Sequence, residues 1–263
     1  MSPIFERYLM PVYLPARLYG SLVKVKRLFI PSAFAPDVHH AVNIKGERDV
    51  EWAFLFTNLP DGPGKAIEFG CEFGHMSLLA ALKGFQVLAV DLQDQPFTWK
   101  HPNVEFVKGD FLKIALPRES FDLAINCSSV EHVGVAGRYG IELDEPDGDI
   151  EVMERLAAVL KPGGLLLMTA PCGKDAVMAP WHRVYGPERL PKILAPFEIL
   201  KEAYWVKNDT NQWTISDQAT ALNSPCRNDP NHGHECLYSL AGFVLRKRAE
   251  IPDNGIRGGA NRC

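Results

Sequence analysis

The sequence predicts an α/β fold built on a mostly parallel β-sheet. From about residue 65 onward, short apolar runs typical of buried strands alternate with helix-like segments. The first run, 65–70, leads into a loop with Gly70 and Gly74, and the second run, 86–91, ends in Asp91. Strands that alternate with helices imply parallel pairing through right-handed crossovers.

The elements follow in a regular order along the chain. Short buried runs rich in Val, Ile, Leu and Phe predict strands at 65–70, 86–91, 104–107, 121–127 and 164–170. A helix follows Gly74 and ends near Gly84. Two further strands, at 197–206 and 237–246, are joined by a long segment, 208–236, that we expect to be an irregular insertion.

The clearest predicted helix spans 149–160. Its apolar side chains at helical spacing line one face: Ile150, Met153, Ala157 and Leu160. Asp147 or Asp149 can cap its start, and the run Lys161-Pro162-Gly163-Gly164 ends it.

Composition limits the class of protein. The 263 residues are 46% hydrophobic and 23% charged, which suits one domain with a substantial core. A formal net charge of -4 gives no basic field for nucleic acid. No apolar run approaches the ~18 residues of a membrane span, and Pro11, Pro15 and Arg17 interrupt the run that a secretory signal needs. We expect a cytoplasmic protein whose six cysteines are reduced: Cys71, Cys127, Cys172, Cys226, Cys236 and Cys263. The first three lie in or beside predicted strands, so we expect them to be buried free thiols.

Three parts of the chain differ in character. Residues 1–45 form a basic, aromatic N-terminal extension, 46–248 form the main domain, and 249–263 form a Gly-, Asn- and Arg-rich tail that we expect to be disordered. The extension either packs on the domain as a helical segment that covers the ligand, or contacts a membrane surface or a partner.

The glycine loop and Asp91 predict a nucleoside site at the carboxyl edge of the sheet. A dinucleotide dehydrogenase would use the same arrangement, but its fingerprint is Gly-x-Gly-x-x-Gly. Here three residues separate Gly70 from Gly74, and Glu72 and Phe73 would obstruct a pyrophosphate at the helix N-terminus. These residues disfavour the dehydrogenase.

Six motifs in order resemble those of the class I S-adenosylmethionine-dependent methyltransferases over about residues 64–246. They are Glu68-Phe69-Gly70-Cys71-Glu72-Phe73-Gly74, Asp91, Lys108-Gly109-Asp110-Phe111, the strand 121–127 with Ser128-Ser129-Val130-Glu131-His132-Val133, the turn and strand 160–171, and the segment 182–190. The resemblance implies a Rossmann-like α/β sheet, mostly parallel with its last strand antiparallel and flanked by helices.

The same resemblance implies S-adenosyl-L-methionine as the cofactor. The residues expected to bind it are Glu68, Gly70, Glu72, Gly74, Asp91, Leu92, Asp110, Phe111 and Asn126. In the family, the acid at the second strand's tip binds the ribose, and the acid after the third strand lies near the adenine amino group. Glu72 stands where the commoner loop has a glycine, so its carboxylate either crowds the methionine end of the cofactor or meets the ammonium group.

Methyl transfer to a hydroxyl needs a base that removes the proton. Three candidates follow the predicted fourth and fifth strands, at the edge where ligands bind: Glu131, His132 and His182. In the alternative interpretation, His132 only packs or caps a helix, and His182 belongs to a lid that does not contact the acceptor.

The segment Trp181-His182-Arg183-Val184-Tyr185 is rich in side chains used for recognition. Aromatic and cationic groups can clamp a sugar ring or a carboxylate. We therefore expect three residues to bind the acceptor: Arg183, Tyr185 and, from the loop after the fourth strand, Tyr139.

We expect no bound metal. Some relatives hold a divalent ion with an earlier acid, a Glu-His pair and a later histidine. Here Ser128 replaces the earlier acid, which leaves a weak set: Glu131, His132 and His182. Four residues of the insertion are of zinc-ligand type but match no usual knuckle spacing: Cys226, His232, His234 and Cys236.

The sequence thus predicts an S-adenosylmethionine-dependent methyltransferase (EC 2.1.1.-). Its Gly137-Arg138-Tyr139-Gly140 and 182–186 segments are similar to methyltransferase-like proteins linked to glycan assembly, which favours O-methylation of a sugar or another small hydroxylated metabolite. The alternatives are N-methylation of a small molecule and a non-catalytic subunit that binds a partner. Retention of Gly70, Gly74 and Asp91 argues against the second.

Overall fold

The computed structural model describes residues 47–95, 97–208, 212–228 and 236–248. The predicted extension, 1–45, and the predicted tail, 249–263, lie outside these residues. The chain divides into two units, Met1–Asn43 and Ile44–Cys263, and the described residues all belong to the second unit.

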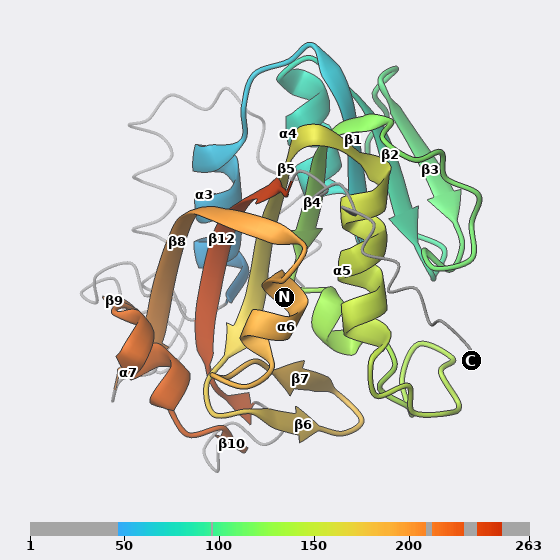
Figure 1. Ribbon diagram of the computed structural model, residues 1–263. Coiled ribbons are helices and arrows are strands. Elements are labelled where there is room, and N and C mark those ends of the chain that lie inside the picture. Colours follow the sequence, from blue (N-terminus) through green and yellow to red (C-terminus); the bar gives the residue numbers. More distant parts are fainter. Residues whose placement is uncertain (1–46, 96, 209–211, 229–235, 249–263) are drawn as a thin grey trace, which may run out of the picture. The chain divides into compact units, whose positions relative to one another are not determined.

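An eight-stranded mixed sheet forms the centre of the second unit (Figure 1). Its order is β3-β2-β1-β4-β5-β12-β8-β9. The strands are β1 (Gly64–Phe69), β2 (Phe85–Asp91), β3 (Val104–Lys108), β4 (Phe121–Cys127), β5 (Leu160–Cys172), β8 (Phe197–Lys207), β9 (Trp213–Ser216) and β12 (Ser239–Lys247). The first five strands pair in parallel, whereas β12 runs antiparallel between β5 and β8. The predicted fold class is therefore confirmed, including the antiparallel last strand.

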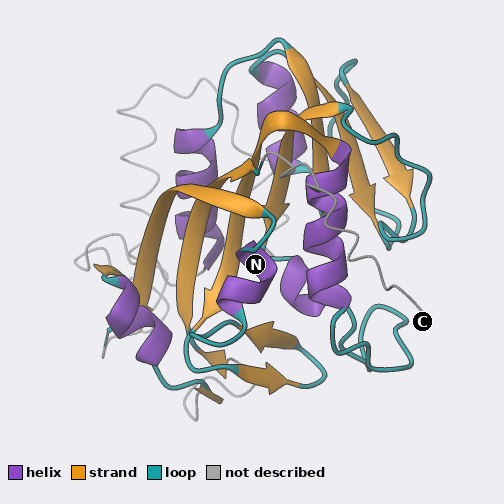
Figure 2. Cartoon of the chain, in the orientation of Figure 1, coloured by secondary structure: helices purple, strands orange, loops and turns teal. Residues whose placement is uncertain are grey.

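Helices cover both faces of this sheet (Figure 2). They are α3 (Glu47–Asn58), α4 (His75–Leu82), α5 (Gly148–Val159), α6 (Leu190–Leu194) and α7 (Gln218–Asn223). The alternation of side chains along each strand decides which helix they contact. In β4, Leu123 and Ile125 pack in the core beneath α3 and α4, whereas Ala124 packs in the core beneath α5. Each buried leucine or isoleucine contributes about 1.5–3 kcal/mol to folding.

The remaining elements are short. A 3-10 turn, η2 (Val130–His132), follows β4, and β6 (Ala176–Met178) pairs with β7 (His182–Val184). β10 (Arg227–Asn228) pairs with β11 (Cys236–Leu237).

Two predicted boundaries need correction. The described part of 208–236 is not irregular, because it contains β9 and α7, and the Asp217 carboxylate caps α7 by accepting a hydrogen bond from the Thr220 amide. The turn expected at 161–164 is extended chain at the start of β5. Three of the cysteines are buried without disulfides, as expected: Cys71, Cys127 and Cys172.

None of the helices in the described residues has both the length and the apolar character needed to cross a membrane.

Candidate active site

A cavity of about 1470 Å³ opens at the carboxyl ends of the parallel strands. Its wall takes residues from the segments that follow β1, β2, β3 and β4, from α3, and from the loop after η2. Parallel strands all point toward this edge, so polar groups far apart in sequence meet there. Ten of the predicted site residues line it: Gly70, Glu72, Asp91, Leu92, Asp110, Phe111, Glu131, His132, Tyr139 and His182.

The glycine loop after β1 is held in one conformation. Gly70 has a φ of +67°, and a Cβ built on it would collide with the Ser129 side chain. Glu72, which lines the cavity, has a φ of +46°. Gly74 does not line the cavity: it precedes α4, and a Cβ there would come within 2.6 Å of the Phe97 ring. Gly74 therefore shapes the loop from outside the wall.

Asp91 is oriented by two backbone amides. The Glu72 amide donates to its Oδ2 over 3.0 Å, and the Gln93 amide donates to its Oδ1 over 2.9 Å. Each oxygen keeps a further lone pair, so the carboxylate can accept hydrogen bonds from a diol.

The segment after β3 adds an acid and an aromatic ring to the wall. Asp110 accepts a hydrogen bond from the Leu112 amide over 2.9 Å and pairs with Lys113 at 2.8 Å. The Phe111 ring packs on Phe69 with centroids 4.8 Å apart.

Two residues expected to bind the cofactor lie behind the wall. Glu68 is buried and accepts a hydrogen bond from the Ser77 hydroxyl, and burial raises its pKa to about 8. Asn126 is fully buried; its amide donates to the Phe69 carbonyl over 3.4 Å and accepts from the Val130 amide. Both residues brace the strand ends rather than line the cavity.

Helix α3 supplies wall residues that the sequence analysis did not identify: Glu47, Arg48 and Glu51. Arg48 pairs with Glu51 at 2.7 Å and with Glu72 at 3.6 Å. Glu51 is fully buried and accepts hydrogen bonds from Ser128 and, over 2.9 Å, from Thr169. In the sequence, the only indication of these wall residues is an arginine flanked by acids at helical spacing. That this face of α3 contacts the edge of the sheet becomes clear only from the tertiary packing.

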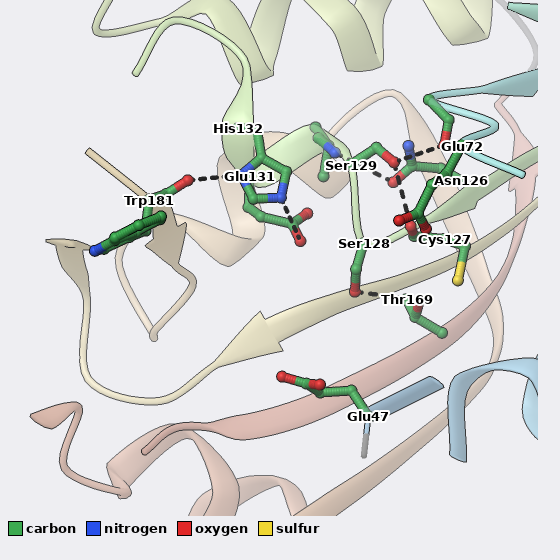
Figure 3. A network of polar contacts seen from close by, with 12 residues as sticks. Glu47, Glu72, Asn126, Cys127, Ser128, Ser129, Glu131, His132, Thr169 and Trp181 are labelled. Carbon is green, nitrogen blue, oxygen red and sulfur yellow. Dashed lines mark hydrogen bonds and ion pairs between the residues drawn. The ribbon is translucent and has the colours of Figure 1, made fainter. Parts of the chain in front are cut away.

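Glu131 and His132 meet in η2 (Figure 3). His132 Nδ1 lies 2.6 Å from the Trp181 carbonyl oxygen, so Nδ1 carries the proton and Nε2 is left as an acceptor. Burial lowers the His132 pKa to about 4 and raises the Glu131 pKa to about 8. The Glu131 Oε1 lies 3.8 Å from His132 Nε2, and its buried Oε2 has no partner among the described residues.

His182 stands beside this pair. Its ring lies 6.1 Å from the His132 ring and 5.2 Å from the Tyr238 ring, both edge to face. Tyr238 donates to the Glu47 carboxylate. The buried Nε2 of His182 has no hydrogen-bond partner in the part of the chain that the structure describes.

Arg183 and Tyr185 do not reach the cavity wall, which corrects their expected contact with an acceptor. Successive side chains in β7 point to opposite sides, so Arg183 faces away from His182's side. Arg183 is buried and donates to the carbonyls of Val133 and Glu145, the latter over 2.9 Å. Tyr185 is fully buried in the core. Tyr139 does line the cavity, and its ring meets His132 with centroids 5.5 Å apart.

Within the described residues, no group of three or more His, Cys, Asp and Glu side chains is placed to hold a metal ion. His232 and His234, two of the four possible zinc ligands, lie outside these residues.

Comparisons with known proteins agree with this architecture. A family model described as a Caenorhabditis protein of unknown function, DUF268, matches residues 103–229. Two curated Mycobacterium tuberculosis proteins, both described as probable S-adenosylmethionine-dependent methyltransferases, are 26% identical over 138 residues. The match covers 49% of this chain and 46% of each relative, so the chain spans about half the length of these relatives.

Solved structures share the fold at low identity. One is a Burkholderia thailandensis 1,6-didemethyltoxoflavin-N1-methyltransferase with bound 1,6-didemethyltoxoflavin and S-adenosylhomocysteine; its TM-score is 0.51 at 17% identity, over 91% of this chain and 93% of that one. The [4+2]-cyclase SpnF has the same TM-score, 0.51, at 17% identity, over 91% and 98%. Because one of these proteins is a methyltransferase and the other a cyclase, the likeness identifies the fold alone. The chain thus shares the Rossmann-like fold of such enzymes, and over about half of its length it is similar to curated proteins described as probable S-adenosylmethionine-dependent methyltransferases.

Proposed function

We propose that this chain is an S-adenosylmethionine-dependent methyltransferase that methylates a hydroxyl group of a small metabolite, with a sugar as the leading acceptor class. One observation carries the proposal. A single cavity joins the amide-oriented carboxylate of Asp91 to the neutral imidazole of His132. The Asp91 carboxylate can accept hydrogen bonds from the diol of a nucleoside, and the His132 imidazole can accept the proton that an acceptor hydroxyl must lose.

The residues present fit the cofactor. Asp91 would accept the ribose hydroxyls, and Leu92 and Phe111 offer apolar surface to the adenine. The ion pair of Arg48 and Glu72 presents a cation and an anion side by side, which complements the carboxylate and ammonium of an amino acid. When bound, S-adenosylmethionine supplies a methyl group that its sulfonium has already activated.

The chain's own part in the reaction is to position the acceptor and accept its proton. The Trp181 carbonyl fixes the His132 tautomer, so Nε2 is the nitrogen that can accept the hydroxyl proton while the oxygen gains the methyl group. Burial keeps Nε2 unprotonated at neutral pH. Placing the acceptor in line with the methyl group lowers the activation free energy of the transfer by roughly 7–11 kcal/mol.

Label transfer tests the proposal. The chain is incubated with methyl-labelled S-adenosylmethionine and matched panels of free sugars, other hydroxylated metabolites and small amines. Label on a hydroxyl compound that disappears in the His132→Ala variant is the expected result. Label on amines alone would overturn O-methylation, and cofactor binding without transfer to any compound would favour the non-catalytic subunit.

A further inference from the structure

Three side chains on the cavity wall form a cluster that the proposed reaction does not use. The Arg138 guanidinium lies over the Tyr139 ring at 4.5 Å and over the Trp181 ring at 5.4 Å. All three residues line the cavity, and both aromatic residues are partly exposed, Tyr139 by 37% and Trp181 by 42%. We call Arg138, Tyr139 and Trp181 the aromatic clamp.

Arg138 differs from Arg48 and Lys113, two other cations of the wall. Arg48 pairs with Glu51 at 2.7 Å, and Lys113 pairs with Asp110 at 2.8 Å. In the described residues, the Arg138 side chain contacts the two rings, and its guanidinium has no hydrogen bond or ion pair. A guanidinium stacked on aromatic faces keeps the N–H donors along its edge available.

The loop that carries Arg138 and Tyr139 is well braced. The Gly137 amide donates to the Ile141 carbonyl over 2.9 Å, and the Ile141 amide donates to the Arg138 carbonyl over 3.0 Å. The side chain of Gln93, just after β2, donates to the Tyr139 carbonyl over 3.3 Å. The guanidinium is thus positioned before any ligand arrives, which lowers the entropic cost of binding.

The clamp adjoins the base. The Tyr139 ring meets the His132 ring at 5.5 Å, edge to face. After burial, the charge of Arg138 is among the causes that lower the pKa of both His132 and His182. The charge therefore lies close enough to act on a group attached to the same small acceptor.

We infer that the aromatic clamp binds an oxyanion, a carboxylate or a phosphate, carried by the acceptor whose hydroxyl meets His132. This inference rests on the proposed function and narrows its acceptor to an acidic hydroxylated metabolite. The edge of a guanidinium matches two oxygens of such a group, and the aromatic faces suit a sugar ring. Arg183 was the cation expected to bind the acceptor, whereas the cation that lies over Trp181 on the cavity wall is Arg138.

Probe binding tests the clamp. Glucuronate, glucose 6-phosphate and neutral glucose are titrated by NMR into the full chain saturated with S-adenosylhomocysteine. The variants are Arg138→Gln and a matched control, Lys207→Gln, which removes another positive charge from the same wall. We expect at least one oxyanion probe to bind the wild type at least about tenfold more tightly than glucose. We expect Arg138→Gln to abolish that preference and Lys207→Gln to keep it.

Comparing the affinities for glucuronate and glucose 6-phosphate shows whether the clamp prefers a carboxylate or a phosphate. Equal affinities for all three probes, no binding of either oxyanion, or a preference that survives Arg138→Gln would each overturn the inference. The affinity for S-adenosylhomocysteine is measured first in the same samples. If that nucleoside fails to bind, the proposed function fails, and the probe preference is then measured in the unloaded protein as a separate result.

Discussion

The imidazole Nδ1 of His132 and the backbone carbonyl oxygen of Trp181, 49 residues apart in the chain, lie 2.6 Å from each other. This contact fixes which nitrogen of His132 carries the proton, because a carbonyl can only accept. It joins the turn after β4 to the hairpin after β5, so two segments that follow neighbouring strands together orient one base.

Replacing His132 tests its role as the base. His132→Ala should lower kcat by at least about a hundredfold, because the variant lacks the proposed base. The affinity for S-adenosylhomocysteine should stay unchanged by calorimetry. His75→Ala, exposed on α4 outside the cavity, is the control and should keep full rate. A His132→Ala enzyme with near-normal turnover would remove the histidine from the mechanism.

The pH profile provides a second test of the same residue. Burial lowers the His132 pKa to about 4, so the neutral form that accepts a proton persists well below pH 6.5. The acidic limb of kcat/KM should therefore fall near pH 4 rather than near pH 6.5. A fall centred near 6.5 would show that His132 is not buried as described.

Glu68 predicts how stability depends on pH. Burial raises its pKa to about 8 in the folded chain, from about 4.5. Between these values the folded state binds more protons than the unfolded state, so this contribution to the free energy of unfolding declines as pH rises toward 8. Glu68→Gln cannot ionise, and its stability should fall less than the wild type's between pH 5 and 8. Parallel urea-denaturation curves would contradict this.

Gly70 predicts a steric requirement in the cofactor loop. Gly70→Ala combines a positive φ with a collision against Ser129, whereas Gly163 has a φ of +75° and nothing within 4 Å of an added Cβ. Gly163→Ala should lower the free energy of unfolding by about 1–2 kcal/mol, the cost of a left-handed residue. Gly70→Ala should cost more. Urea midpoints compare the two variants, and equal losses would mean that Ser129 moves aside freely.

Local pattern predicted the strands well because each is a short buried run ending in a distinctive residue. Asp91 and the glycine loop were found in this way, since both follow directly from the strand ends. Arg183 was misplaced because a three-residue strand sends neighbouring side chains to opposite sides, and only His182 of that pair faces the cavity.

Contacts between segments that are distant in the chain could not be predicted from the sequence pattern. The sequence around Arg48 does not indicate that α3 contacts the glycine loop. In the structure, Arg48 pairs with Glu72 of that loop and lines the cavity. Likewise, Arg138 meets Trp181 only because the loop after β4 folds against the hairpin after β5.

The most direct test of the central claim is a calorimetric titration of S-adenosylmethionine and S-adenosylhomocysteine into the wild type and Asp91→Ala, with NAD as a control. We predict that both sulfur nucleosides bind, that NAD does not, and that Asp91→Ala weakens binding by about tenfold or more, because hydrogen bonds to a charged group contribute roughly 1.5–3 kcal/mol. Absence of binding by both nucleosides, or affinities unchanged in Asp91→Ala, would contradict the cofactor site proposed here.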